Sequence, residues 1–259
     1  FEIDDPFAEE HATKRKILVT YSRMFDPLGL LAPVTIIPLM IFQRCWIKGY
    51  DWDDPLGPED EALWLKWINT TKKCLGQIRI PRVLMTSKPT SVQLFCFTDG
   101  SNNAYGTVVY IRAEYEDKNV SVIPRIELMG ALLGAQLVFQ IRKAIEAESV
   151  VFLSDSQTVL WWLSLTNKQL QLYVGNRVRQ INLLTSDEKW NFVPGEQNPA
   201  DHPTRGLQAD QIATSSWFKG PDFLYSGMLP TQPDIGPTKE GLVEVKKITD
   251  DSVFRLTEE

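Results

Sequence analysis

The hydrophobic positions in the first third of the chain repeat with helical spacing. Ile17, Leu18, Tyr21 and Met24 share one helix face, which turn residues at 26–29 then end. A second, apolar helix and a third that starts at an acidic stretch are expected over 33–46 and 59–75. The pattern therefore predicts a small helical unit over residues 1–85.

Beyond residue 90 the period changes to that of β-strands, and strands then alternate with helices. Aromatic and β-branched runs predict strands at 92–98, 104–112, 118–123, 150–153 and 190–193. Helices are expected over 125–147 (opened by Pro124), through 161–162, over 170–184 and near residue 201. This order predicts an α/β domain over 86–207, with a mixed five-stranded sheet flanked by helices. Residues 208–259 form a partly irregular C-terminal extension.

Composition and charge narrow the class of protein. Hydrophobic residues make up 43% and charged residues 23%, as in globular chains. The net charge of −6 argues against coating nucleic acid by bulk charge. However, residues 1–10 carry −5, residues 207–259 carry 5 − 9 = −4, and residues 11–206 carry 22 − 19 = +3. The body of the chain is therefore compatible with a nucleic-acid duplex.

The spacing of the cysteines and the start of the sequence indicate the kind of cellular compartment that we expect for this chain. Cys45, Cys74 and Cys96 lie too far apart in sequence for a zinc motif or a disulfide framework, and a reducing compartment fits. The uncharged run 27–43 is short and interrupted by prolines, so no membrane span is expected. The chain starts without Met or a signal peptide, and we expect a piece of a longer protein that is not secreted.

Four carboxylates stand at special places in the predicted plan. Asp99 and Asp155 follow strands, Glu127 lies in the first turn of the long helix, and Asp201 starts the last helix. If the first and fourth strands are parallel neighbours, Asp99 and Asp155 meet where open α/β sheets bind ligands. Oxygen ligands without a Cys or His cluster point to Mg²⁺ or Mn²⁺. Each residue alone also fits an ordinary role in a turn, a helix dipole or a helix cap.

Several motifs resemble one family in a fixed order. They are Phe97-Thr98-Asp99-Gly100-Ser101, Ile123-Pro124-Arg125-Ile126-Glu127-Leu128, Leu153-Ser154-Asp155-Ser156, and Trp190-Asn191-Phe192-Val193-Pro194-Gly195 leading to Asn198-Pro199-Ala200-Asp201. They resemble the RNase H region of Pao/BEL-type LTR retrotransposon polyproteins. Residues 25–33 and 52–56 resemble the thumb and connection segment that follows the polymerase palm there. The resemblance covers about residues 14–225.

The resemblance implies an RNase H fold and an endoribonuclease that cleaves the RNA strand of RNA/DNA hybrids. It assigns Asp99, Glu127, Asp155 and Asp201 as catalytic residues and ligands of two Mg²⁺ or Mn²⁺ ions. Asp99 would bridge both ions, Glu127 and Asp155 would hold the ion that activates water, and Asp201 the ion at the leaving 3′ oxygen. The polymerase part of the polyprotein is a possible partner. The implied location is the cytoplasm, the nucleus or a virus-like particle.

Substrate contacts are expected near these acids, because an RNase H must sense 2′-hydroxyls across the minor groove. The candidates are Ser101, Asn102, Asn103 and Asn198, with a turn-forming role as the alternative, and Arg177 and Arg179 for phosphates. The loop 195–198 lacks the His that cellular RNases H carry there. His202 is a possible helper, and a solvent-facing helix residue is the alternative.

Other functions are less well supported by the sequence. Tyr50-Asp51-Trp52-Asp53-Asp54 has one residue too many for a polymerase Tyr-x-Asp-Asp, so no polymerase activity is expected. The remaining alternative is a domesticated scaffold that keeps the fold and binds protein or nucleic acid without cleaving. The presence of four acids favours the enzyme, since a scaffold gains nothing from acids that repel one another.

Overall fold

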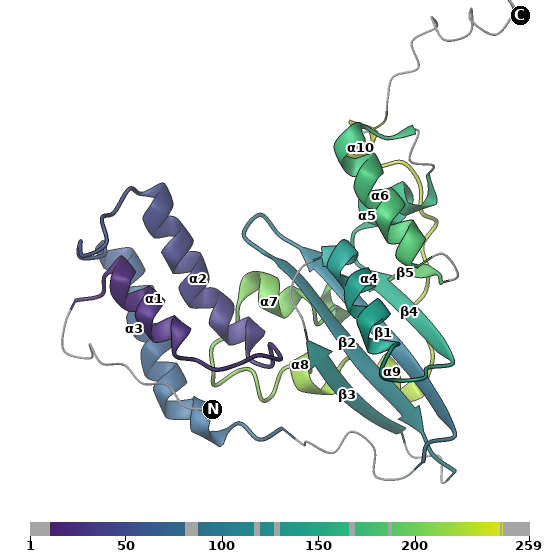
Figure 1. Cartoon of the computed structure of the whole chain (residues 1–259), viewed down its shortest axis with the longest axis horizontal. Helices are drawn as coiled ribbons and strands as arrows, with labels where there is room; N and C mark the ends of the chain where they lie inside the picture. Colours follow the sequence, from purple (N-terminus) through teal and green to yellow (C-terminus); the bar gives the residue numbers. More distant parts are fainter. Residues whose placement is uncertain are drawn as a thin grey trace, which may run out of the picture.

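The computed structural model has a helical end and a sheet end (Figure 1). It describes residues 11–80, 88–116, 120–126, 130–165, 169–185, 188–243 and 245. The N-terminal helices are α1 (Lys14–Ser22), α2 (Ala32–Ile47) and α3 (Pro58–Cys74), followed by the short 3-10 helix η1 (Leu75–Gln77). The predicted helical unit is present, and its predicted end at residue 85 lies outside the described residues.

Local capping explains where these helices begin. The Thr13 hydroxyl accepts the Lys16 N–H and caps α1. The Asp26 carboxylate accepts the N–H groups of Leu30 and Leu31 at 2.9 and 2.7 Å just before α2. Asp60, in the acidic first turn of α3, is fully buried and pairs with Lys48 of the loop after α2 at 2.7 Å. These polar contacts hold the turns between the helices.

The sheet is mixed, and the predicted α/β architecture is confirmed. Its order is β3-β2-β1-β4-β5, antiparallel from β3 to β1 and parallel from β1 to β5. The strands are β1 (Ser91–Gly100), β2 (Tyr105–Glu114), β3 (Val120–Ile126), β4 (Ser149–Ser154) and β5 (Trp190–Phe192). The two parallel neighbours β1 and β4 end side by side, with Thr98 opposite Ser154.

One predicted boundary is wrong. Pro124 does not open the long helix but lies inside β3, opposite Tyr110. β3 is an edge strand, where a residue without an N–H is tolerated. The helix α4 is described over Gly130–Ile141 and is shorter than the predicted 125–147.

Helices cover both faces of the sheet (Figure 1). Alternate β1 residues Leu94 and Cys96 pack with α4, while Phe95 and Phe97 belong to the cluster on the other face. The remaining helices are α5 (Gln157–Ser164), α6 (Leu172–Leu184), η3 (Gly195–Gln197), α7 (Asp201–Arg205), α8 (Ser216–Lys219), α9 (Phe223–Ser226) and α10 (Lys239–Leu242).

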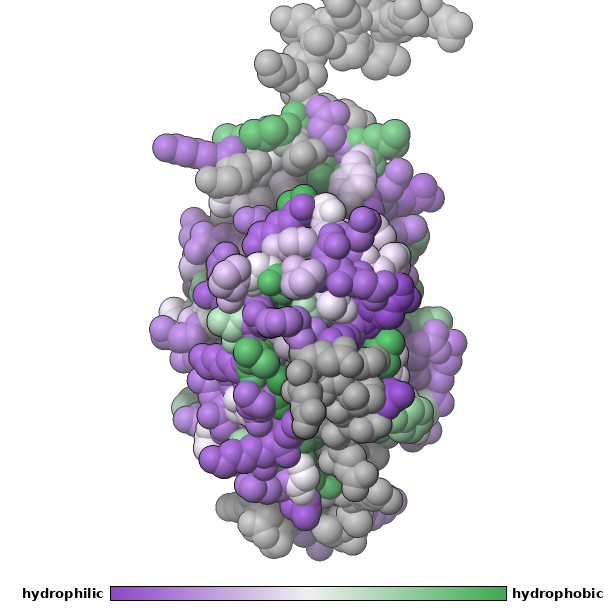
Figure 2. All heavy atoms as spheres, turned by 90° about the vertical axis from the view of Figure 1, so that its left-hand side faces the viewer, coloured by the Kyte–Doolittle hydropathy of each residue, from purple (hydrophilic) through white to green (hydrophobic). Residues whose placement is uncertain are grey.

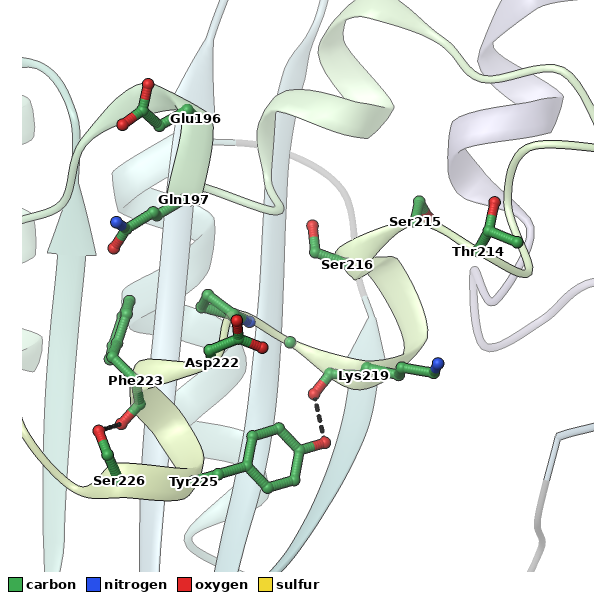
Figure 3. A pocket seen from close by; sticks show the side chains of 12 residues that line it. Glu196, Gln197, Thr214, Ser215, Ser216, Lys219, Asp222, Phe223, Tyr225 and Ser226 are labelled. Carbon is green, nitrogen blue, oxygen red and sulfur yellow. Dashed lines mark hydrogen bonds between the residues drawn. The ribbon is translucent and has the colours of Figure 1, made fainter.

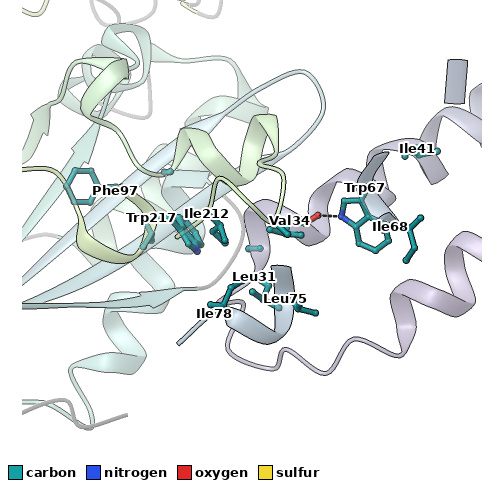
Figure 4. Close-up of a cluster of buried hydrophobic side chains, with 14 of the residues drawn as sticks. Leu31, Val34, Ile41, Trp67, Ile68, Leu75, Ile78, Phe97, Ile212 and Trp217 are labelled. Carbon is teal, nitrogen blue, oxygen red and sulfur yellow. Dashed lines mark hydrogen bonds between the residues drawn. The ribbon is translucent and has the colours of Figure 1, made fainter. Parts of the chain in front are cut away.

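One hydrophobic cluster joins the helical end to the sheet (Figure 4). It includes Val34 and Trp67 of the helical unit and Phe97 of β1, with Ile212 and Trp217 from the segment after α7. Trp217 is fully buried, and its indole N–H donates to the Leu30 carbonyl at 2.8 Å. The start of the predicted C-terminal extension is therefore part of the main core. Its predicted boundary near residue 207 stays a prediction.

Figure 2 shows the helical end of the molecule as mainly hydrophilic, with separate hydrophobic side chains among polar ones. Within the described ranges, no helix combines the length and the apolar character needed to cross a membrane.

Candidate active site

The ends of β1 and β4 bring two of the predicted acids together. Asp99 is the penultimate residue of β1, and Asp155 directly follows β4. Because β1 and β4 are paired in parallel up to Thr98 and Ser154, both carboxylates lie at the same edge of the sheet. The condition for Asp99 and Asp155 to meet, that the first and fourth strands are parallel neighbours, is therefore fulfilled.

The third acid, Asp201, is the first residue of α7, which packs against β1 and β2. This close approach requires Gly106 on β2, since a Cβ there would lie 2.4 Å from the Ala200 carbonyl oxygen. The glycine therefore allows the start of α7 to reach the end of β1.

The negative charges of Asp99 and Asp201 both act on Asp155. The pKa of Asp155 is raised to about 6, first by burial and then by the negative charge of Asp99, with a smaller contribution from Asp201. A hydrogen bond from the Asn198 side chain acts in the opposite direction. A cation bound here would relieve this repulsion.

Asn198 has a different role from the predicted substrate contact. It is only 2% exposed, and its amide donates to the Thr98 carbonyl at 3.0 Å while its oxygen accepts the Ala200 N–H at 3.2 Å. Buried polar groups need such partners. Asn198 therefore fixes the loop before α7 against the end of β1 instead of facing a nucleic acid.

Two residues that the sequence analysis missed contact the acids from α7. The Thr204 hydroxyl donates a short hydrogen bond to Oδ2 of Asp99, and the Arg205 Nε donates to Oδ1 of Asp201 at 2.5 Å. The i to i+4 spacing of Asp201 and Arg205 on a helix is the one sequence signal for the second pair. The first pair joins residues 105 positions apart and has no such signal.

Comparison with known families gives one match, which spans residues 13–122 and is described as Pao retrotransposon-like RNaseH-like domain. The match covers less than half of the chain, and over these residues the chain is similar to that family. The match covers the helical unit and β1 with Asp99, and it ends before the other three acids. The predicted resemblance to the RNase H region of a Pao-type retrotransposon is confirmed.

Solved structures with distant similarity to this chain include two RNases H and a protease-reverse transcriptase. RNase H1 from Halobacterium salinarum NRC-1 is 12% identical with a TM-score of 0.27, and covers 42% of this chain and 90% of its own. An N-terminal RNase H domain from Mycobacterium tuberculosis, solved as a maltose-binding-protein fusion, is 16% identical with a TM-score of 0.29, covering 49% and 99%.

The third structure is the foamy viral protease-reverse transcriptase in complex with RNA/DNA hybrid. It is 11% identical with a TM-score of 0.24, and the match covers 59% of this chain and 26% of that chain. Among curated proteins, no significant match is found.

The β1–β2 turn of the Pao-like segment carries three predicted substrate contacts. Asn102 and Asn103 are exposed beside Asp99. Ser101 is instead engaged in the turn, because its hydroxyl accepts the N–H groups of Asn103 and Ala104, both at 3.1 Å. Of these three residues, Asn102 and Asn103 are the ones with exposed side chains.

The predicted phosphate contacts lie on α6, which packs against α4 and α5. Arg177 and Arg179 are both exposed. The Arg177 guanidinium stacks over the Tyr173 ring at 3.4 Å and donates to the Tyr173 carbonyl at 3.2 Å. The structure places neither arginine in contact with the aspartates.

His202 points to α8 and not to the acids. Its Nε2 hydrogen bonds with the Ser216 hydroxyl at 2.9 Å. Burial lowers its pKa, although the charge of Asp201 acts in the opposite direction. The solvent-facing alternative is corrected, because the side chain is half-buried and bound to Ser216, and the helper role stays a prediction.

A cavity of about 660 Å³ lies between η3 and the α8–α9 segment (Figure 3). Ser216, the partner of His202, lines it. The lining also combines the carboxylates of Glu196 and Asp222 with the ammonium of Lys219, so no single ligand charge is favoured. The cavity adjoins the η3 loop beside Asp155, but Asp99, Asp155 and Asp201 do not line it.

The donor set suits a hard divalent cation, because carboxylate oxygens are the ligands that Mg²⁺ and Mn²⁺ prefer. The raised pKa of Asp155 shows that the negative charges converge. Glu127, the fourth predicted ligand, lies outside the described residues. Among the residues that are described, no three His, Cys, Asp or Glu side chains form a group that could hold an ion. A complete metal site therefore needs Glu127 or bound water in addition.

Proposed function

We propose that this chain is a metal-dependent ribonuclease H that cleaves the RNA strand of RNA/DNA hybrids. The observation that carries the proposal is the placement of Asp99 and Asp155 at the ends of two parallel neighbouring strands, with Asp201 at the start of the helix that packs against β1. The family match of residues 13–122, described as RNaseH-like, agrees with this proposal. A scaffold without catalysis has no use for mutually repelling carboxylates.

Asp99, Asp155 and Asp201, with Glu127, would hold two Mg²⁺ or Mn²⁺ ions. When bound, such ions activate water and stabilise the leaving oxygen of a phosphodiester. Burial and the charge of Asp99 disfavour the Asp155 carboxylate, and a bound cation would stabilise it. Asn198 keeps the loop that carries Asp201 against β1. The protein thus supplies a fixed set of oxygen ligands.

The exposed Asn102 and Asn103 would contact the substrate beside Asp99. Small amides at this position suit recognition of 2′-hydroxyls across the wide minor groove of a hybrid. Phosphate contacts by Arg177 and Arg179 stay a proposal of lower rank, since the contacts of Arg177 are with Tyr173 of its own helix α6. The polymerase part of a retrotransposon polyprotein is the proposed protein partner, and an intracellular location is proposed with it.

The test is cleavage of a labelled RNA/DNA hybrid by the whole chain with Mg²⁺ or Mn²⁺. We expect wild type to cut the RNA strand and to leave single-stranded RNA and duplex DNA intact. Asp99→Asn should reduce the rate at least 100-fold, on the order of the loss that follows removal of a group acting in the transition state. Asp210→Asn, an exposed acid in another turn, is the matched control and should cut normally.

Absence of cleavage by wild type with both metals would overturn the proposal and favour the domesticated scaffold. Equal rates for wild type and Asp99→Asn would show that any activity comes from another site or a contaminant.

A further inference from the structure

Thr204 is a buried hydroxyl residue that faces the first catalytic acid. The residue is 1% exposed, and its Oγ1 donates to Oδ2 of Asp99. Its second neighbour is the Asp201 carbonyl oxygen at 3.0 Å. A hydroxyl has one proton, and the shorter contact with a carboxylate takes it, because hydrogen bonds to charged acceptors are stronger.

The surroundings hold Thr204 in this orientation. Its methyl group packs against Gly106, where an added Cβ would lie 3.0 Å from Thr204 Cγ2. The Ser101 hydroxyl lies 3.2 Å from the Thr204 carbonyl oxygen and can donate to it. Contacts from β2 and from the β1–β2 turn therefore fix the residue on both sides.

This arrangement leaves one Asp99 oxygen uncommitted. With Oδ2 bound to Thr204, the carboxylate plane cannot rotate freely, and Oδ1 has no hydrogen bond among the described residues. Partners that orient ligating carboxylates commonly change metal affinity 10–100-fold when removed. A fixed Asp99 is pre-organised to bind a cation.

We infer that Thr204 is a positioning residue that orients Asp99 for a divalent cation. The inference rests on the proposed function, since it assumes that Asp99 binds a metal. Thr204 itself donates to the carboxylate and does not touch substrate. Loss of its hydroxyl should weaken metal binding while the fold stays intact.

The test is calorimetric titration of the metal-free whole chain with Mn²⁺. We expect Thr204→Val, which keeps the shape and removes the hydroxyl, to bind Mn²⁺ roughly tenfold more weakly. Thr204→Ser keeps the hydroxyl and should stay within about twofold of wild type, since the carboxylate keeps its donor. Rescue by serine separates the hydroxyl from a packing role.

Thr71→Val is the matched control, since Thr71 is fully buried in α3 and its hydroxyl has no hydrogen-bond partner in the described structure. It should bind Mn²⁺ like wild type. Circular dichroism and the melting temperature without metal should show that every variant is folded.

Equal Mn²⁺ affinity of Thr204→Val and wild type would overturn the inference and leave the proposed function standing. Absence of Mn²⁺ binding by wild type would overturn both. Weak binding by Thr204→Ser, equal to that of Thr204→Val, would assign the effect to packing and also overturn the inference.

Discussion

At the scale of single residues, Asp155 shows that a carboxylate in this acidic site is destabilised when no metal is bound. Its pKa is raised from 3.8 to about 6, because burial and the charge of Asp99 disfavour the carboxylate. The folded chain therefore holds a proton that the unfolded chain releases. The contribution of Asp155 to the free energy of unfolding is therefore fully present below about pH 4, and it is lost as the pH rises through about 6.

Asp155→Asn should therefore stabilise the metal-free chain at pH 7.5. We expect a gain of about 1 to 2 kcal/mol, after allowance for the partial solvent exposure of the side chain. At pH 4 the variant and wild type should be nearly equal. Urea unfolding with a chelator at pH 4, 5, 6 and 7.5 measures this difference.

The control for this prediction is Asp210→Asn, which should follow wild type at every pH. A constant difference between Asp155→Asn and wild type from pH 4 to 7.5 would contradict the proposed origin of the effect.

The sequence identifies some residues of the candidate site, but it does not predict the orientation of others. Asp99 and Asp155 could be identified because each follows a strand, and the structure brings them together. Asn198 and His202 were assigned to function by their place near Asp201, yet one is buried against β1 and the other binds Ser216. A single sequence does not show which way a polar side chain near a site points.

At the scale of elements, a side chain of α3 donates a hydrogen bond to a carbonyl group of α2 that has lost its partner within the helix. Pro38 lies inside α2 and has no N–H, so the Val34 carbonyl four residues earlier loses its helical partner. The Trp67 indole of α3 donates to that carbonyl at 2.8 Å. The hydrogen bond satisfies a buried acceptor and joins the two helices.

A double-mutant cycle on Pro38 and Trp67 should show that the Trp67 hydrogen bond compensates for the N–H that Pro38 lacks. Trp67→Phe leaves the Val34 carbonyl unpaired, whereas in the Pro38→Ala background the restored N–H of residue 38 can satisfy it. We expect Trp67→Phe to cost roughly 1 kcal/mol less in the Pro38→Ala background than in wild type. Chemical unfolding of wild type, the two single variants and the double variant gives the coupling energy. Additive changes in the free energy of unfolding would contradict this role of Trp67.

The ends of helices and strands can be predicted from neighbouring residues in the sequence, except where pairing with a distant strand decides the structure. The acidic first turn of α3 could be read from the sequence. The start of α4 could not, because Pro124 is typical of a helix start and is also tolerated in an edge strand. Pairing of β3 with β2 decides between these two structures.

At the scale of the whole molecule, the helical unit and the sheet share one core. Trp217 lies between them, fully buried, with its indole N–H on the Leu30 carbonyl. A chain with a continuous core is expected to unfold as one cooperative unit. The C-terminal segment that carries Trp217 therefore supports both parts.

Trp217→Ala should destabilise the whole chain by about 3 to 5 kcal/mol, since it opens a large cavity in the shared core. We expect one calorimetric transition in wild type and one at lower temperature in the variant. Two transitions, of which only one shifts, would show that the helical unit and the sheet unfold independently.

The sequence by itself determined the helical unit, the mixed α/β class, the family resemblance and the aspartates at strand ends, because periodicity and motifs are local properties. The tertiary structure decided the orientation of Asn198 and His202, the strand that contains Pro124, and the burial of Trp217 in the shared core. It also revealed the Thr204–Asp99 hydrogen bond. These features depend on contacts between residues far apart in the chain, and such contacts form only when the chain packs.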